Sequence, residues 1–202
     1  MADEPHPSLR ERKKRDTRKA LSDAALELMF ERGIDNVVRE DIAERAGVSV
    51  RTFNNYFAGK FEALAYRHIE RLRRSAALLL TRPAGEPLWT ALTEALVEPL
   101  REDGAGGPPT LQMLAETRKL RAAPEMQAAA AKALGDELIV AVAQRSGTEP
   151  TDLYPKLVAA TVNAAYLVAL DTYSHSDPPA PVTTVLREVL AHLSQGLPAP
   201  AD

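Results

Sequence analysis

The chain has 202 residues, of which 45% are hydrophobic and only 5% aromatic, with a formal net charge of −3. This length suffices for one large or two small domains with a buried core, and the mild acidity excludes a protein that coats polyanions indiscriminately. The lack of cysteine excludes disulfides, thiolate metal sites and cysteine nucleophiles, and is typical of a reducing cytosol. Ala and Leu dominate the apolar residues and no alternating Val/Ile/Thr run is found, so we expect an all-α fold.

The chain opens with residues 1–9, an acidic, proline-containing stretch that we expect to be a disordered tail. No apolar segment follows the first basic charges, which argues against a signal peptide. The next segment is a basic cluster that either begins a solvated helix or forms an arm that grips DNA phosphates or the minor groove. The cluster comprises Arg10, Arg12, Lys13, Lys14, Arg15, Arg18 and Lys19.

A first helix is predicted from about Arg15 to Arg32, where Gly33 ends it. A stripe of Leu, Ala and Met side chains between residues 21 and 29 repeats at helical spacing, and we expect it to form the core of a three-helix domain.

Residues 33–60 predict a helix, a tight turn and a second, short helix. Ile42, Ala43 and Ala46 lie on one helical stripe, and Gly47 follows where the chain must turn left-handed. Ser49 offers a hydroxyl as N-cap of the second helix. This is the helix-turn-helix arrangement, whose second helix enters the DNA major groove.

The second helix has two faces. Its inward face carries Val50, Phe53 and Phe57, and its outward face carries Arg51, Thr52, Asn54 and Asn55. Short polar and forked groups of this kind can contact base edges and phosphates. An ordinary helical hairpin with a solvated polar face is the alternative interpretation.

This stretch resembles the N-terminal DNA-binding domain of TetR-family transcriptional regulators. The residues that match the family pattern are Gly33, Ile34, Asp41, Ile42, Ala43, Ala46, Gly47, Val48, Ser49, Thr52, Phe53, Tyr56, Phe57 and Lys60. The departures are Val38 in place of a capping Thr, Arg39 at an apolar position, Asn54 in place of an aromatic and Phe61 in place of an acid.

The resemblance implies a DNA-binding domain over residues 10–60. We expect Arg51 and Asn55 to contact bases, with Val50 against a thymine methyl. Phosphates are expected to be held by Thr52, Asn54, Tyr56 and Lys60. Arg39 and Arg15, at the starts of their helices, complete the predicted DNA contacts.

The rest of the chain, residues 61–197, is predicted to form a ligand-binding and dimerisation domain, followed by a disordered tail over residues 198–202. The expected helices are 60–80, 87–101, 110–121, 124–145, 152–174 (with Asp152 as cap) and 182–197. In the family, the first of these joins the DNA-binding head to the regulatory domain and transmits the ligand signal. Its His68 is either a hydrogen-bonded core or boundary histidine or a group that senses ligand or pH.

The last two helices carry more apolar surface than one small domain readily hides. The 152–174 helix is apolar almost all round, and the 182–197 helix presents a stripe from Val182 to Leu193. We therefore predict a homodimer with a four-helix interface built from these two helices of each subunit. A monomer whose core absorbs all of this surface is the alternative.

No nucleophile–base pair, phosphate-binding loop or metal-ligand spacing is present, so we expect no enzyme activity, no cofactor and no metal. A small-molecule effector of unknown identity is expected in a mostly apolar cavity of the C-terminal domain. Candidate lining residues are Trp89, Leu92, Met113, Thr117, Met126, Leu138, Asn163, Tyr166 and Leu167. Asn163 is the most informative, because an amide in an apolar helix needs a partner, which is a ligand, a residue across the dimer or another side chain.

The sequence thus favours a cytoplasmic, ligand-responsive repressor that binds a pseudo-palindromic double-stranded operator as a homodimer, without membrane association. Two other classes remain open: an all-α ligand-binding or scaffold protein with a structural helix-turn-helix, and a helical enzyme using the C-terminal cavity.

Overall fold

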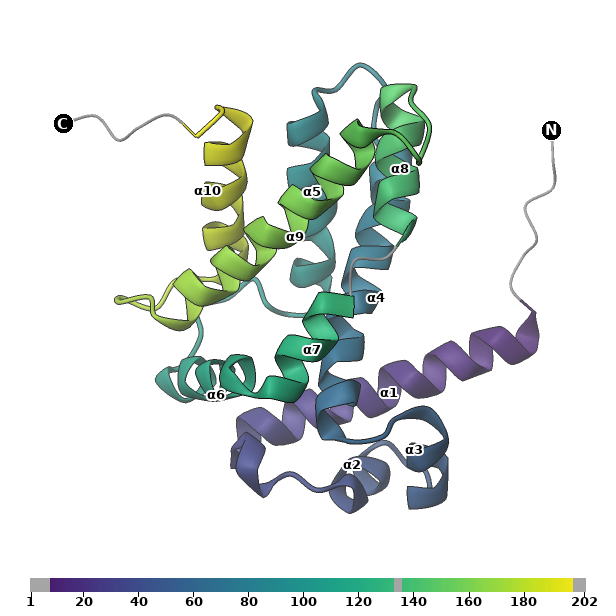
Figure 1. Ribbon diagram of the computed structural model, residues 1–202. Helices are drawn as coiled ribbons and strands as arrows, with labels where there is room; N and C mark the ends of the chain where they lie inside the picture. The colour runs from purple at the N-terminus through teal and green to yellow at the C-terminus, as the bar shows by residue number, and fades with distance from the viewer. Residues whose placement is uncertain (1–7, 133–135, 198–202) are drawn as a thin grey trace.

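The computed structural model describes residues 8–132 and 136–197 of the chain. The predicted tail 198–202 and all but the last two residues of the predicted tail 1–9 lie outside this part. Within the described residues the chain forms ten α-helices and one short 3-10 helix and no strand (Figure 1), so the all-α prediction is confirmed.

The N-terminal elements are α1 (Leu9–Arg32), the 3-10 turn η1 (Ile34–Asn36), α2 (Arg39–Arg45) and α3 (Val50–Tyr56). Helix α1 begins well before the predicted start near Arg15, because Ser8 and Glu11 form a capping box. The Glu11 N–H donates to Ser8 Oγ at 3.3 Å, and the Ser8 N–H donates to Glu11 Oε2 at 2.8 Å. The basic cluster is therefore helical.

The remaining helices form the body of the molecule. They are α4 (Lys60–Thr81), α5 (Leu88–Glu102), α6 (Leu111–Ala122), α7 (Pro124–Lys132), α8 (Asp136–Ser146), α9 (Leu153–Ser174) and α10 (Val182–Ser194). The helix predicted over 124–145 is described as α7 and α8, and residues 133–135 between them lie outside the described part of the chain. Asp152 occupies the N-cap position of α9, but its carboxylate accepts from the Glu149 N–H at 3.0 Å and not from α9.

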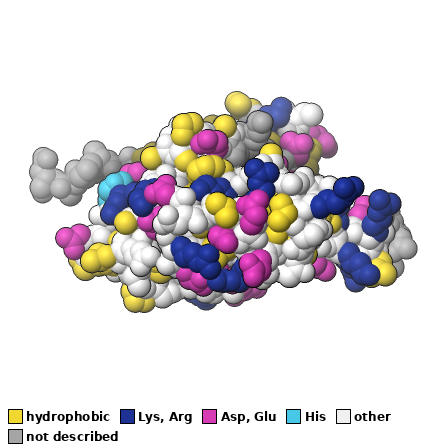
Figure 2. Space-filling view, turned by 90° about the horizontal axis from the view of Figure 1, so that it is seen from below, with side chains coloured by type: hydrophobic (Ala, Val, Ile, Leu, Met, Phe, Trp, Pro, Cys, Tyr) yellow, Lys and Arg dark blue, Asp and Glu magenta, His cyan; other side chains and the backbone are white. Residues whose placement is uncertain are grey.

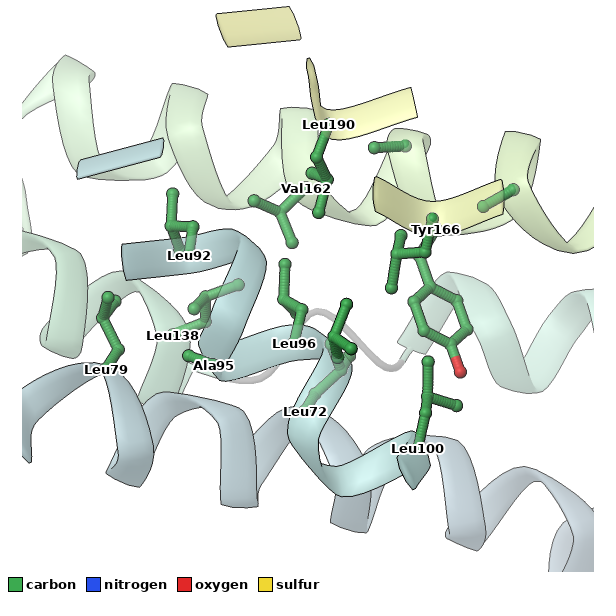
Figure 3. Close-up of a cluster of buried hydrophobic side chains, with 14 of the residues drawn as sticks. Leu72, Leu79, Leu92, Ala95, Leu96, Leu100, Leu138, Val162, Tyr166 and Leu190 are labelled. Carbon is green, nitrogen blue, oxygen red and sulfur yellow. The ribbon is translucent and has the colours of Figure 1, made fainter. Parts of the chain in front are cut away.

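Two apolar cores are joined by α4 (Figure 1). The head core gathers residues 21–64, with Leu21, Ile42 and Phe53 fully buried. The body core begins at Leu72 on α4 and extends to Leu190 on α10. Figure 3 shows its centre, where leucines of α4, α5 and α8 meet side chains of α9 and α10. Helix α4 thus contributes buried side chains to both cores.

Candidate functional site

The turn between α2 and α3 has the geometry that its sequence predicts. Gly47 has φ +68°, a left-handed conformation that favours glycine. Ser49 Oγ accepts from the Thr52 N–H at 3.1 Å, which caps α3. Phe53 and Phe57 are buried with their ring centroids 6.0 Å apart, so they fix the inner face of α3 against the head core.

The outer face of α3 is open to solvent. Arg51, Asn54 and Asn55 are exposed, whereas Val50 and Thr52 are half-buried. The Thr52 hydroxyl lies 2.9 Å from Ser49 Oγ, so its side chain also takes part in the cap. These exposed donors and acceptors on a rigid, capped helix are suited to reading a groove.

Other predicted DNA-contact residues form hydrogen bonds with residues of the head, Arg39 and Asn54 at its surface and Lys60 in a half-buried position. Arg39 donates to Asn54 Oδ1 at 3.3 Å, which orients the Asn54 amide. Lys60 Nζ donates to the carbonyls of Ile34 at 2.6 Å and Val37 at 3.1 Å, so one of its three donors is left for a phosphate. Val38 provides no side-chain cap for α2.

The two predicted contacts nearest α1 differ in exposure. Arg15 is exposed on α1. Tyr56, the last residue of α3, is half-buried, and the Arg18 guanidinium lies 5.8 Å from its ring centroid. This cation–π contact ties α1 to the recognition helix.

Helix α6 is bonded to the head by a residue that sequence reasoning missed. Glu116 is 6% exposed and accepts from the Ile34 N–H at 2.7 Å and from Lys119 Nζ at 2.9 Å. The Ile34 N–H and then the Lys119 ammonium hold the pKa of the Glu116 carboxyl below its ordinary value. Gly33, with φ +81°, brings the backbone against this carboxylate. The partners are 82 positions apart, so no local pattern could have revealed them.

The same helix is also bonded to α9. Arg118 donates to the Ser174 carbonyl. Arg121 donates to the Leu167 carbonyl at 2.9 Å and to Asp171 at 3.0 Å. Helix α6 therefore has polar contacts with the head at one side and with α9 at the other.

An arginine cluster joins α4 to α1 and to the end of α5. Arg67 pairs with Asp23 of α1, while Arg71 and Arg74 donate to the Asp103 carboxylate at 2.7 and 2.8 Å. Burial, and then the neighbouring charge of Arg71, lowers the pKa of Arg67 to about 10. Burial acts to raise the pKa of Asp103, but hydrogen bonds from Arg71 and Arg74 and the charges of Arg71 and Arg67 outweigh it and hold this pKa below its ordinary value. These ion pairs hold the head against the body.

The predicted effector residues do not all point inward. Trp89 and Leu138 pack into the body core with Leu92 and Tyr166, whereas Leu167 is 38% exposed and does not belong to that core. Three others lie outside that cluster. Met113 and Met126 are half-buried, and the buried Thr117 hydroxyl donates to the Met113 carbonyl within α6 at 2.8 Å.

A polar spot interrupts the body core where α4 meets α9. The His68 ring lies 4.4 Å from the Tyr166 ring, centroid to centroid. Neither ring nitrogen of the 9%-exposed His68 finds a hydrogen-bond partner among the described residues. Asn163, three residues before Tyr166 on α9, has an Oδ1 that is likewise unpaired within the described residues. The expectation of a hydrogen-bonded histidine is therefore not met there. Burial first, and the charge of Arg71 second, lowers the pKa of His68 to about 4, so the ring is neutral at physiological pH.

The outer face of α9 is apolar and open. Leu153, Leu157 and Val168 are 79%, 58% and 54% exposed and lie on one helical stripe. By length and composition alone α9 also passes as a membrane-crossing helix, a test that core helices of soluble proteins pass too. The sequence predicted that α10 presents an apolar stripe to a second subunit. In the structure, four residues of this stripe are buried in the subunit's own core: Val182, Val185, Leu186 and Leu190. The open apolar surface therefore belongs mainly to α9.

No group of three or more His, Cys, Asp or Glu side chains suited to a metal ion is found among the described residues.

Comparisons with known proteins agree with this architecture. The family model for bacterial regulatory proteins of the tetR family matches residues 21–65, and the MftR C-terminal domain model matches residues 86–198. The putative mycofactocin biosynthesis transcriptional regulator MftR of Mycobacterium tuberculosis is 32% identical over 175 residues, covering 85% of each chain. The regulator TcmR of Streptomyces glaucescens is 41% identical over 90 residues, covering 44% of this chain and 39% of its own.

Solved structures share the fold. Thermus thermophilus FadR, a TetR-family repressor in complex with lauroyl-CoA, has a TM-score of 0.54 at 23% identity, covering 92% of this chain and 97% of its own. A putative TetR-family regulator from Syntrophomonas wolfei has a TM-score of 0.58 at 15% identity, covering 93% and 99%. The head, the body and these relatives together show that the chain belongs to the TetR family of bacterial transcriptional regulators and is not an enzyme.

Proposed function

We propose that this regulator is a cytoplasmic repressor that binds a pseudo-palindromic operator as a homodimer and is released by a small effector held in the C-terminal body. The observation that carries the proposal is the outer face of α3, where Arg51, Asn54 and Asn55 project from a capped helix whose other face is locked in the head core. Two such helices, about 34–36 Å apart, would occupy successive major-groove faces.

The exposed stripe of α9 supports the dimer. Leucine and valine side chains exposed along one face of a long helix are costly in water and are covered in a stable assembly. An isologous contact through α9, with α10 at its edge, would bury this stripe on both subunits and fix the spacing of the two heads.

The polar spot in the body core suggests the chemistry of the effector. Asn163 Oδ1 needs a donor, and the neutral His68 ring offers one donor and one acceptor. Most of the body core is apolar, including Leu72 and Val162, and the charge of Arg71 acts on the His68 ring. We therefore expect an uncharged or amphipathic effector that places a hydroxyl or N–H group beside α9.

Release would follow from differential binding. We expect the effector to bind more tightly to a conformer with displaced heads than to the conformer that binds DNA. The affinity for the operator then falls by a factor set by the ratio of the effector's affinities for the two conformers. Helix α4, shared by both cores, and helix α6, bonded to both the head and α9, are the elements through which the two sites can communicate.

Similarity to MftR suggests where operators should be sought. Both the C-terminal family model and the relative that covers 85% of the chain carry that name. Promoters of genes related to mycofactocin biosynthesis are therefore the first candidates for a natural operator.

The test is selection of a random duplex library by the purified protein at two salt concentrations, followed by sequencing. Enrichment of an inverted repeat with half-sites one helical turn apart supports the proposal. Weak binding without an enriched motif, lost as salt rises, shows backbone contact alone and contradicts it.

Replacing Arg51 tests the assignment of base readout. Arg51→Ala should weaken binding to the selected operator by roughly 1–3 kcal/mol and relax the preference at one position of each half-site. Tyr56→Phe removes only a hydroxyl and should weaken all duplexes alike, so it serves as the matched control. An unchanged sequence preference in Arg51→Ala would show that this side chain does not read bases.

A further inference from the structure

Helix α4 carries three arginines where it passes from one apolar core to the other. Its last residue in the head core is Leu64, and its first residue in the body core is Leu72. Arg67, Arg71 and Arg74 lie around this crossing, and their spacing of four and three residues places them on one side of the helix. The seam between head and body is therefore polar on this side.

The seam beside these arginines is bridged by ion pairs around a small hollow. The hollow lies between α1, α4 and the end of α5 and is lined by charged and polar residues: Lys19, Ser22, Asp23, Tyr66, Arg67, Glu70, Arg74 and Asp103. Close apolar packing fixes the relative position of elements inside a core. At this seam the same task falls to directional polar contacts.

Asp103 is at the centre of these ion pairs. Its side chain is 7% exposed and accepts from Arg71 Nε at 2.7 Å and from Arg74 Nη2 at 2.8 Å, while Arg67 Nη2 lies 3.5 Å away. Asp103 is the C-cap residue of α5, and Gly104, with φ +80°, follows it. The helix dipole disfavours a carboxylate at a C-terminal helix end, so its arginine partners account for an aspartate at this position.

Arg67 connects Asp103 to the head. Its Nη1 pairs with Asp23 of α1 and its Nη2 with Asp103, and its side chain is 14% exposed. The guanidinium is a planar, rigid fork, so one side chain sets the separation of the two carboxylates. Asp23, Arg67 and Asp103, which we call the Asp103 clamp, thus tie the middle of α1 in the head to the end of α5 in the body.

A second connection lets the clamp control an angle. Helix α6 holds the C-terminal end of α1, where Gln112 donates to the Phe30 carbonyl at 3.1 Å and Glu116 accepts from the Ile34 N–H. Phe30 follows Asp23 by seven positions, which is about 10 Å along α1. Two attachments on one helix fix its direction, whereas α4 alone can bend as other long helices do. Without the clamp, the head is free to swing about its contact with α6.

We propose that the Asp103 clamp determines which half-site spacing the dimer accepts, by fixing the angle between each head and its body. The inference rests on the proposed operator binding by a homodimer and adds to it the residues that set spacing specificity. An interface through α9 sets the distance between the two bodies but leaves the angle of each head open. One added base pair moves a half-site by about 3.4 Å along the duplex and turns it by about 35° around the axis. Rigid heads cannot follow both changes, whereas swinging heads can.

The test measures affinity by fluorescence anisotropy for the selected operator, for the same operator with one base pair inserted between the half-sites, for a single half-site and for a scrambled duplex. The wild type should bind the selected operator more tightly than the inserted one. Asp103→Asn replaces the carboxylate by an amide of nearly the same shape. Its affinity for the selected operator should fall about tenfold, toward that for the inserted operator, because the heads are no longer preorganised. Its affinity for the single half-site should stay as in the wild type, since α3 and the head core are unchanged.

Arg67→Lys is an independent second variant. It keeps the positive charge but replaces the fork by a single ammonium, which cannot hold two carboxylates in one fixed geometry. It should lose as much spacing discrimination as Asp103→Asn and likewise keep the affinity for the single half-site.

The matched control is Glu102→Gln, which should keep the discrimination of the wild type. It removes the same charge one position earlier, from a side chain that is 51% exposed and pairs with Arg74. Figure 2, which views the molecule from below, shows Lys and Arg side chains interspersed with Asp and Glu. The loss of one exposed carboxylate therefore changes the field around the heads little.

Unchanged discrimination in a folded Asp103→Asn or Arg67→Lys variant, with folding checked by circular dichroism, would overturn the clamp. An equal loss in Glu102→Gln would show a general electrostatic effect, and an equal loss on the single half-site would show damage to the head itself; either result overturns the clamp as well. A wild type that prefers the operator to the scrambled duplex but tolerates the inserted base pair overturns the clamp and leaves the proposed function in place. If the wild type binds the scrambled duplex as tightly as the operator, the proposed function itself fails.

Discussion

At the residue scale, the buried ring of His68 has a pKa of about 4 against an ordinary value of 6.5, because burial disfavours its charged form. Because the folded-state pKa is depressed, the unfolded chain binds more protons between these two values. The stability contributed by the neutral ring is complete above about pH 6.5 and is lost as the pH falls toward 4, by about 3 kcal/mol in total. His68→Met should remove this part of the acid sensitivity, measured as the free energy of unfolding from pH 7 to pH 4.5. Replacement of the exposed His192 by Gln should leave it in place, and an equal effect of both variants would contradict the assignment to His68.

At the scale of single elements, α6 connects the body to the head through Glu116. Glu116→Ala leaves the Ile34 N–H without its partner and should cost about 1–3 kcal/mol of stability. Glu116→Gln keeps an acceptor for that N–H and should restore most of the loss. Hydrogen exchange of residues 33–37 should be faster in the alanine variant than in the glutamine variant. Equal exchange in the wild type and in both variants would show that α6 does not restrain η1.

The elements also show what could be predicted from the sequence. Gly47, Ser49 and the Phe53 stripe act through neighbours only a few residues away, so the local pattern predicted the turn, the cap and the inner face of α3. The early start of α1 was missed although Ser8 and Glu11 have capping-box spacing, which is a readable signal. The bonds of Glu116 and Asp103 join segments far apart in the chain, and their partners are set by tertiary packing that no periodicity encodes. The DNA contacts and the effector residues remain predictions, because each depends on a molecule outside the chain.

At the scale of the whole molecule, the α9 stripe is expected to determine whether two heads act together. Leu157→Glu would place a charge at a position that is 58% exposed in the single subunit, where it costs little in the monomer but is not tolerated in a closed apolar interface. The variant should therefore fold normally and sediment as a monomer. Its affinity for an operator with both half-sites should approach that for a single half-site. Leu80→Glu introduces the same charge at an exposed leucine on α4, away from α9 and α10, and should remain dimeric. A Leu157→Glu variant that stays dimeric and retains full operator affinity would place the interface elsewhere on the body, and the spacing of the two recognition helices would then have to be set by another contact.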